Sequence, residues 1–178
     1  HGFNASTFAC RVSASTRSDL TSSISAGIGT LKGELHGGAN EYSAKLVNTF
    51  STVEEAIIGV KNKLSNKEKI MGFGHGVYKI KDPRSQVVKS WAEKLSVNDK
   101  EVNKLEIAKA IDLTMKEEKD LFPNVDFYGG LLLDLLGFKT EVFTPIFVVG
   151  RTAGWSAHYF EQREQDILIR PAAKYIGK

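Results

Sequence analysis

Apolar residues recur every three to four positions along most of this chain, the spacing that places side chains on one face of an α-helix. The first such series predicts a single helix over about residues 8–28, and it consists of Phe8, Val12, Leu20, Ile24 and Ile28. Glycines at positions 27, 29 and 33 indicate where this helix loosens and ends.

Capping signals predict where the next helices begin. Helical spacing resumes over residues 40–50, with Leu46, Val47 and Phe50 on one side. Thr52 and Glu55 have the spacing of a capping box, which predicts a helix from there to about residue 64. Asp82 followed by Pro83 predicts another helix start, running to about residue 95, because a side-chain cap precedes a residue whose fixed φ suits the first turn.

The second half of the chain is also helical in pattern. A helix over about residues 99–118 is expected to turn five residues inward: Val102, Leu105, Ala108, Ile111 and Met115. The run 131–136 is nearly all apolar, which predicts a helix segment buried on all sides and ended by Gly137. A last helix is expected over residues 144–162, followed by an irregular tail from 167. Since no segment alternates as a strand does, the predicted fold class is all-α.

Composition and charge narrow the class of protein. With 178 residues, 42% hydrophobic and 25% charged, the chain has the composition of a soluble globular protein. Its single cysteine indicates a reducing compartment, and we expect a cytoplasmic location. The net charge of +3 suits a small anionic substrate and is too weak to indicate nucleic-acid binding. A single cysteine, Cys10, excludes an internal disulfide and is expected to be a packing residue. The chain contains no run of 18 apolar residues, so no membrane-spanning helix is predicted. Because the chain opens on His1 without Met, we expect a fragment of a longer protein.

Three segments combine a polar residue with glycine-rich or apolar surroundings. In Leu35-His36-Gly37-Gly38, the glycines would admit a ligand close to the backbone and the histidine could donate an N–H to it; alternatively, the glycine pair caps a helix beside an incidental histidine. In the segment 71–78 and the Asp82-Pro83-Arg84 that follows, His75 and Arg84 could grip an anionic substrate, although the segment lacks the lysine and hydroxyl of a phosphate-binding P-loop.

The third segment is Pro123-Asn124-Val125-Asp126-Phe127-Tyr128. Asp126 stands between apolar residues at an expected helix boundary. It is therefore either the N-cap of that helix or a carboxylate whose pKa desolvation would raise, making it a better base.

Taken together, these segments resemble the citrate synthase family. The resemblance rests on His1-Gly2-Phe3-Asn4-Ala5-Ser6-Thr7-Phe8, LHGGANE, GFGH with VYK and DPR, PNVDFY, Arg151-Thr152-Ala153-Gly154-Trp155 and Ile169-Arg170-Pro171, and it covers essentially the whole chain. It implies a citrate-synthase-like fold in which residues 38–137 form a complete small helical domain. Residues 1–37 and 138–178 would then be the flanking C-terminal part of a large helical domain whose N-terminal half is absent.

The resemblance also implies roles for individual residues. Asp126 matches the base that deprotonates acetyl-CoA, His36 the donor to the thioester oxygen, and His75 the residue that polarises the ketone of oxaloacetate. Four positions match residues that hold oxaloacetate, the last of them from the partner subunit of a homodimer: His1, Arg84, Arg151 and Arg170. The turn of Met71, Gly72, Phe73 and Gly74 matches the one that receives the adenine of CoA.

The implied reaction is an acyl transfer that joins acetyl-CoA to oxaloacetate and hydrolyses citryl-CoA, with no metal or redox cofactor. His158 matches no catalytic position, and we expect it to be structural. Two alternatives stay open: a 2-methylcitrate synthase that uses propionyl-CoA, because discrimination of a methylene rests on pocket shape, and a catalytically silent CoA-binding or assembly module. The isolated chain is expected to be inactive because half of the large domain is missing.

Overall fold

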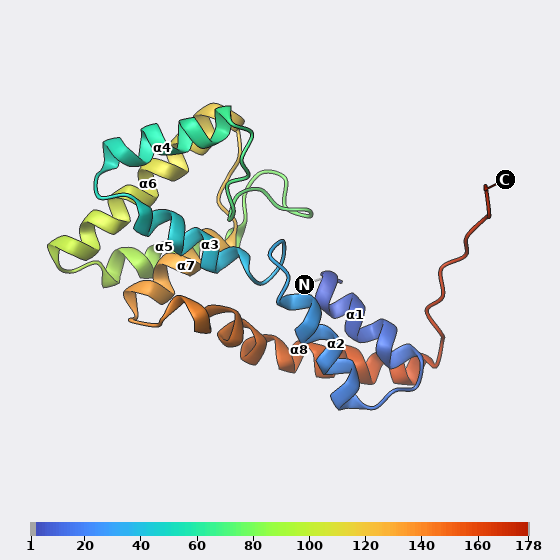
Figure 1. Cartoon of the computed structure of the whole chain (residues 1–178). Coiled ribbons are helices and arrows are strands. Elements are labelled where there is room, and N and C mark those ends of the chain that lie inside the picture. Colours follow the sequence, from blue (N-terminus) through green and yellow to red (C-terminus); the bar gives the residue numbers. More distant parts are fainter. Residues whose placement is uncertain (1–2, 178) are drawn as a thin grey trace. The chain divides into compact units, whose positions relative to one another are not determined.

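The structure is a computed structural model that describes residues 3–177, and in this part of the chain it is all-α (Figure 1). The elements, in chain order, are α1 (Ala5–Ser15), α2 (Leu20–Leu31), α3 (Ala39–Thr49), α4 (Val53–Ser65), α5 (Pro83–Leu95), α6 (Asp99–Lys119), α7 (Val125–Leu135), the short 3-10 helix η1 (Thr140–Val142) and α8 (Phe143–Gln165). The predicted all-α class is confirmed.

The chain divides into two compact units. Unit 1 comprises His1–His36 and Ile146–Lys178, and unit 2 comprises Gly37–Pro145. The expected division of the complete enzyme into segments 1–37, 38–137 and 138–178 stays a prediction.

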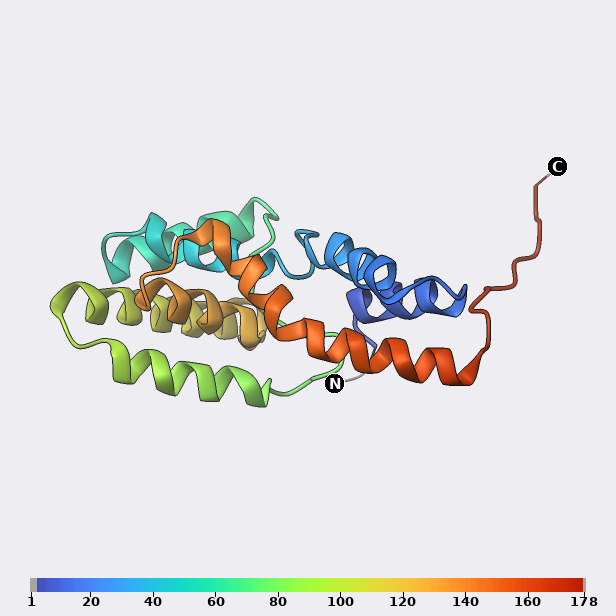
Figure 2. The ribbon, with the colours of Figure 1, turned by 90° about the horizontal axis from the view of Figure 1, so that it is seen from below.

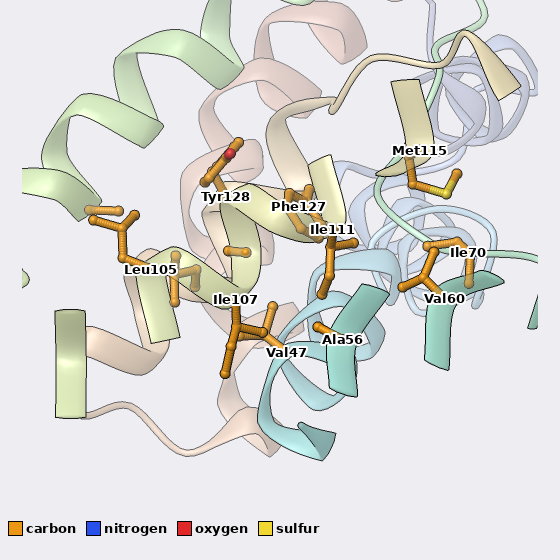
Figure 3. Packing of buried hydrophobic residues seen from close by; sticks show 13 residues of the cluster. Val47, Ala56, Val60, Ile70, Leu105, Ile107, Ile111, Met115, Phe127 and Tyr128 are labelled. Carbon is orange, nitrogen blue, oxygen red and sulfur yellow. The ribbon is translucent and has the colours of Figure 1, made fainter. Parts of the chain in front are cut away.

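Unit 2 is built around α7, which packs against both α3 and α5, while α4 packs along α6 (Figures 1 and 2). The side chains between these helices form one apolar cluster (Figure 3). Its largest members are fully buried: Val47, Val60, Ile107, Ile111, Met115, Phe127, Tyr128 and Leu131. This core fixes the N-terminus of α7, where Asp126 lies.

Unit 1 brings α1 and α2 together with α8 around the buried indole of Trp155. A Cβ atom on Gly27 of α2 would lie 2.9 Å from Trp155 Cε2, so only glycine leaves room for this approach. Cys10 is fully buried, and its Sγ lies 3.7 Å from the carbonyl oxygen of Trp155. Burial raises the pKa of the Cys10 thiol, which agrees with its predicted role as a packing residue.

The single helix predicted over residues 8–28 is wrong. Two helices, α1 and α2, occupy this segment, and the chain turns between them at Arg17, which has a φ of 67°. Asp19 starts the second helix by accepting a hydrogen bond from the backbone N–H of Ser22 (2.8 Å). A side-chain cap thus interrupts an apolar pattern that continues through it.

Two predictions of burial are also wrong. Val102 is 42% exposed, although the other four residues predicted to face inward from α6 are buried. In the run 131–136, Leu131 is buried but Leu136 is 51% exposed. Apolar composition indicates that a helix can be buried, but the neighbouring helices determine which of its faces are covered.

The predicted helix starts are confirmed. Thr52 accepts a hydrogen bond from the N–H of Glu55 (3.2 Å), although the Glu55 carboxylate accepts the N–H of Ser51 (2.8 Å) and not that of Thr52 as a capping box requires; Asp82 caps α5 with Pro83 in the first turn. Gly137 follows α7 with a φ of +80°. No residue from 167 to 177 belongs to a helix or strand. Within residues 3–177, no helix has the length and apolar character needed to cross a bilayer, and no three His, Cys, Asp or Glu side chains gather as metal ligands would.

Candidate active site

Asp82 organises the start of α5 in unit 2. It is buried, and it accepts hydrogen bonds from Nε of Arg84 on Oδ1 (2.9 Å) and from Nη2 of Arg84 on Oδ2 (2.8 Å). Burial by itself would raise the pKa of Asp82, but the hydrogen bonds and the charge of Arg84 hold it below its usual value. Because one edge of the guanidinium is occupied by Asp82, the edge formed by Nη1 and Nη2 is the one that Arg84 offers to a ligand.

The same carboxylate connects α5 to α7. Oδ2 of Asp82 also accepts the backbone N–H of Val125, the first residue of α7 (3.0 Å). One buried side chain therefore positions both Arg84 and the first turn of the helix that carries Asp126.

The glycine turn at residues 71–74 is joined to the segment before α7. Phe73 pairs with Pro123 in an isolated antiparallel bridge, and Asn124 donates its backbone N–H to the carbonyl of Gly72 and its side-chain N–H to that of Gly74 (both 2.9 Å). Gly72 has a φ of +88°, and a Cβ there would lie 2.9 Å from Cβ of Phe127, so the turn requires glycine. These bonds hold His75 next to the N-terminal end of α7.

A cavity of about 210 Å³ lies beside this turn. Met71 lines it together with Lys45, Lys63 and Lys69. Lys63 is paired with Glu68 (2.8 Å) and Lys45 lies 4.0 Å from Glu41, so among the described residues Lys69 is the lysine of this lining without a recorded ion pair and could meet a negatively charged group.

The hydrogen bonds of His75 define its tautomer. Its Nδ1 accepts the backbone N–H groups of Val77 (3.0 Å) and Tyr78 (3.2 Å), so the ring proton lies on Nε2. Nη2 of Arg84 lies 3.3 Å from Nε2, so the imidazole and the guanidinium stand next to each other before the first turns of α5 and α7.

Asp126 is the second residue of α7 and is not its N-cap. The N-cap is Asn124, whose Oδ1 accepts the N–H of Asp126 (2.9 Å), so the predicted capping role of Asp126 is wrong. The Asp126 side chain is only partly exposed, and among the described residues its carboxylate has no hydrogen-bond donor. Desolvation raises its pKa to about 6, although the charge of Arg84 acts in the opposite direction. The alternative prediction, a desolvated carboxylate, therefore describes this residue.

His36 lies in unit 1 and is held by Ser6. Its Nε2 is 2.8 Å from Oγ of Ser6 and accepts the backbone N–H of the same residue (3.3 Å), so the ring proton of the neutral form lies on Nδ1. Burial and the charge of Arg151 lower the pKa of His36 and favour this neutral form. Ser6 is itself fixed by the indole N–H of Trp155 (3.3 Å) and by Oδ1 of Asn4 (2.9 Å).

The glycines after His36 do not cap the preceding helix. α2 ends at Leu31, and Gly38 occupies the N-cap position of α3. The alternative prediction of a C-capping pair is therefore wrong.

The other residues predicted for the site occur in separate segments of the chain. His1 lies outside the described residues. Arg151 belongs to α8, and its charge acts on His36 within unit 1. Arg170 is exposed in the tail, directly after Ile169, whose N–H donates to Oγ of Ser15 (3.1 Å). His158 pairs with Nη1 of Arg11 (3.0 Å).

Three residues of the site were missed as functional residues in the sequence: Ser6, Asp82 and Asn124. Each lies inside a quoted motif, HGFNASTF, DPR or PNVDFY. Motif membership was thus the available signal, but the bonds that give these residues their roles join segments 30 to 50 residues apart.

Comparison with known proteins gives a consistent result. Residues 1–172 match the family model described as citrate synthase, C-terminal domain. The chain is 45% identical over 177 residues to a 2-methylcitrate synthase of Shewanella oneidensis, covering 99% of this chain and 47% of that protein. It is 47% identical over 177 residues to citrate synthase 2 of Bacillus subtilis, covering 99% and 48%. The chain thus spans about half the length of the curated relatives it matches.

Solved structures agree with this similarity. A ternary complex of carboxymethyl coenzyme A and oxaloacetate with citrate synthase from Thermoplasma acidophilum matches with a TM-score of 0.92 and 39% identity, covering 100% of this chain and 49% of that one. A citryl-CoA lyase from Hydrogenobacter thermophilus matches with a TM-score of 0.81 and 27% identity, covering 100% of this chain and 72% of that one.

Proposed function

Because this chain belongs to the citrate synthase family, we propose that the complete enzyme joins the acetyl group of acetyl-CoA to oxaloacetate and hydrolyses the resulting citryl-CoA. The observation that carries this proposal is Asp126, a desolvated carboxyl that lies near Arg84 and has a pKa of about 6. A base with a pKa close to neutral accepts a proton more readily than an ordinary aspartate and is still ionised at pH 7.

In the proposed reaction, the carboxylate of Asp126 takes a proton from the acetyl methyl group. The negative charge that develops on the thioester oxygen needs a donor, and the Nδ1–H of neutral His36 would supply it. Two features support this role: Ser6 holds Nε2 as an acceptor, and the lowered pKa of His36 keeps the ring neutral. A neutral donor stabilises the enolate without competing electrostatically for the base.

The methyl carbon then forms a bond to the ketone carbon of oxaloacetate, and the ketone oxygen becomes an alkoxide. Nε2–H of His75 and the Nη2 of Arg84, 3.3 Å apart, are donors suited to that oxygen. The free edge of Arg84 would also bind a carboxylate of oxaloacetate. Arg151 and His1 are proposed to complete the contacts with oxaloacetate, as their family positions imply.

The turn of Met71, Gly72, Phe73 and Gly74 is proposed to receive the CoA adenine. The neighbouring cavity supports this through Lys69, whose positive charge suits the phosphates that CoA carries. Arg170 is proposed to serve the site of a partner subunit in a homodimer. Its exposed position in the tail leaves the guanidinium accessible to such a partner.

A second candidate is synthesis of 2-methylcitrate from propionyl-CoA. It is favoured by the relative of that name from Shewanella oneidensis at 45% identity. One methylene changes binding in an apolar pocket by only about 1–3 kcal/mol, so the ratio of kcat/KM for the two acyl-CoAs in the complete enzyme distinguishes the candidates.

The proposal is tested with Asp126→Asn in the complete enzyme. We expect oxaloacetate to bind with nearly unchanged affinity, whereas exchange of the acetyl-CoA methyl protons with deuterated solvent should fall by about 10²–10⁴-fold, because an amide keeps the shape but accepts no proton. Asp120→Asn, an exposed change of the same kind after α6, is the control. Exchange at an unchanged rate in Asp126→Asn would exclude this residue as the base.

A further inference from the structure

A second cavity of unit 2, of about 390 Å³, lies beside the first turns of α5. Its other walls come from α6 and from the segment 121–123 that precedes α7. None of the residues proposed above to contact substrate or CoA lines it. Asp82, which positions Arg84, does line it, so the cavity adjoins the proposed active site. Its volume falls within the range of small-molecule sites.

One wall carries an unsatisfied polar group. Ser85 lines the cavity and is only 3% exposed, and its hydroxyl has no hydrogen-bond partner among the described residues. A buried hydroxyl without a partner is unfavourable, so most such groups in proteins are paired. This hydroxyl oxygen is itself buried, so it is out of reach of a ligand in the cavity, and the lysines described next are the polar groups of the wall that can contact one.

The charge around the cavity is positive. Two acidic residues line it, but both are already neutralised: Asp82 by Arg84, and Asp112 by Lys89 (3.2 Å). Tyr128 also donates its hydroxyl to Asp112 (2.8 Å). Lys81 and Lys116 remain, and the structure records no ion pair for either with the described residues. The first turn of α5 adds the partial positive charge of a helix N-terminus.

The remaining lining is apolar. Ile80 and Leu121 are exposed at the surface, and Phe122 and Pro123 are partly buried beside them. A hydrated inorganic ion would leave these surfaces uncovered, whereas a molecule with an apolar body would bury them.

We propose that this cavity binds a small organic anion, with its carboxylate or phosphate facing Lys81 and Lys116, and its apolar body against Phe122 and Pro123. Because Asp82 forms part of the wall and positions both Arg84 and the first residue of α7, a ligand bound here contacts the residue that orients the proposed active site.

The test is an NMR titration of the ¹⁵N-labelled 178-residue chain with phenyl phosphate, benzoate and the neutral isostere benzamide. We expect at least one of the two anions to give saturable shifts at the amides of Ser85, Leu121 and Val125, with benzamide binding at least about tenfold more weakly. The two anions separate a phosphate from a carboxylate preference.

Variants locate the site. Lys81→Gln with Lys116→Gln should weaken binding of the anion by about tenfold or more, since charge-assisted hydrogen bonds are lost. Lys94→Gln, on α5 but outside the cavity, should leave the affinity unchanged. The proposal is overturned if neither anion gives saturable shifts up to about 10 mM, or if the affinity of the double lysine variant equals that of the unaltered chain.

Discussion

Asp126 makes the chain less stable at neutral pH than an uncharged side chain of the same shape would. Its pKa rises from 3.8 to about 6 because folding desolvates the carboxylate. A group whose pKa is higher in the folded state binds its proton more tightly there. Stability therefore decreases as the pH rises from below 3.8 through about 6.

The difference between 3.8 and about 6 corresponds to about 3 kcal/mol of unfolding free energy above pH 7. Partial exposure of the side chain screens some of this, so we expect about 2–3 kcal/mol. Asp126→Asn keeps the shape and removes the charge, and it should therefore be more stable than the unaltered chain by about this amount at pH 8. Between pH 4.5 and 8 the difference between the two proteins should grow by about 2 kcal/mol, because at pH 4.5 the native carboxyl is mostly protonated.

The assay is equilibrium urea unfolding of both proteins, followed by far-ultraviolet circular dichroism at several pH values from 4.5 to 8. Other titrating groups, such as Asp82, are present in both proteins and largely cancel in the difference. Asp120→Asn is the control, because Asp120 is exposed and has the left-handed φ of 51° that asparagine also tolerates. If the free energies of Asp126→Asn and the unaltered chain run parallel from pH 4.5 to 8, desolvation does not control this carboxyl.

Three further predictions concern binding, packing and activity. Arg84→Lys in the complete enzyme should weaken oxaloacetate binding by about tenfold or more and acetyl-CoA binding much less, because lysine lacks the planar fork; calorimetric titrations that show equal loss for both ligands would place the effect on folding through Asp82. Gly27→Ala should destabilise unit 1 by about 1–3 kcal/mol, since its Cβ would lie 2.9 Å from Trp155, and urea unfolding followed by Trp155 fluorescence in a Trp91→Phe background measures this. The control Gly29→Ala, whose Cβ meets nothing within 4 Å, should be neutral or stabilising. The 178-residue chain alone should form no measurable citrate in a thiol-release assay with acetyl-CoA and oxaloacetate. Positioning two reactants contributes on the order of 7–11 kcal/mol to catalysis, and this chain spans only 47–48% of the length of three of its relatives. Turnover close to that of a complete relative would refute this.

The sequence by itself determined the features that depend on neighbouring residues. Thr52 and Asp82 cap their helices through bonds to groups two or three residues away, and Gly137 follows a helix in a conformation that glycine adopts freely. Such interactions are local, so residue type and spacing are sufficient to predict them. The linked motifs likewise identified the family, because their order along the chain is itself sequence information.

Only the tertiary structure decided which faces are covered and what each polar group bonds. Val102 continues the apolar pattern of α6 and yet is exposed, because no spacing rule tells where a neighbouring helix ends. The spacing around Asp126 allowed either a cap or a desolvated base, and the desolvation that distinguishes the base arises only when the rest of the chain packs around its carboxylate. Asp82 was predictable as a cap, but its bond to Val125, 43 residues away, arises only when α5 and α7 pack together. The pKa of Asp126 and the tautomer of His36 depend on such long-range contacts. For that reason these two properties of the site could not be predicted from the sequence.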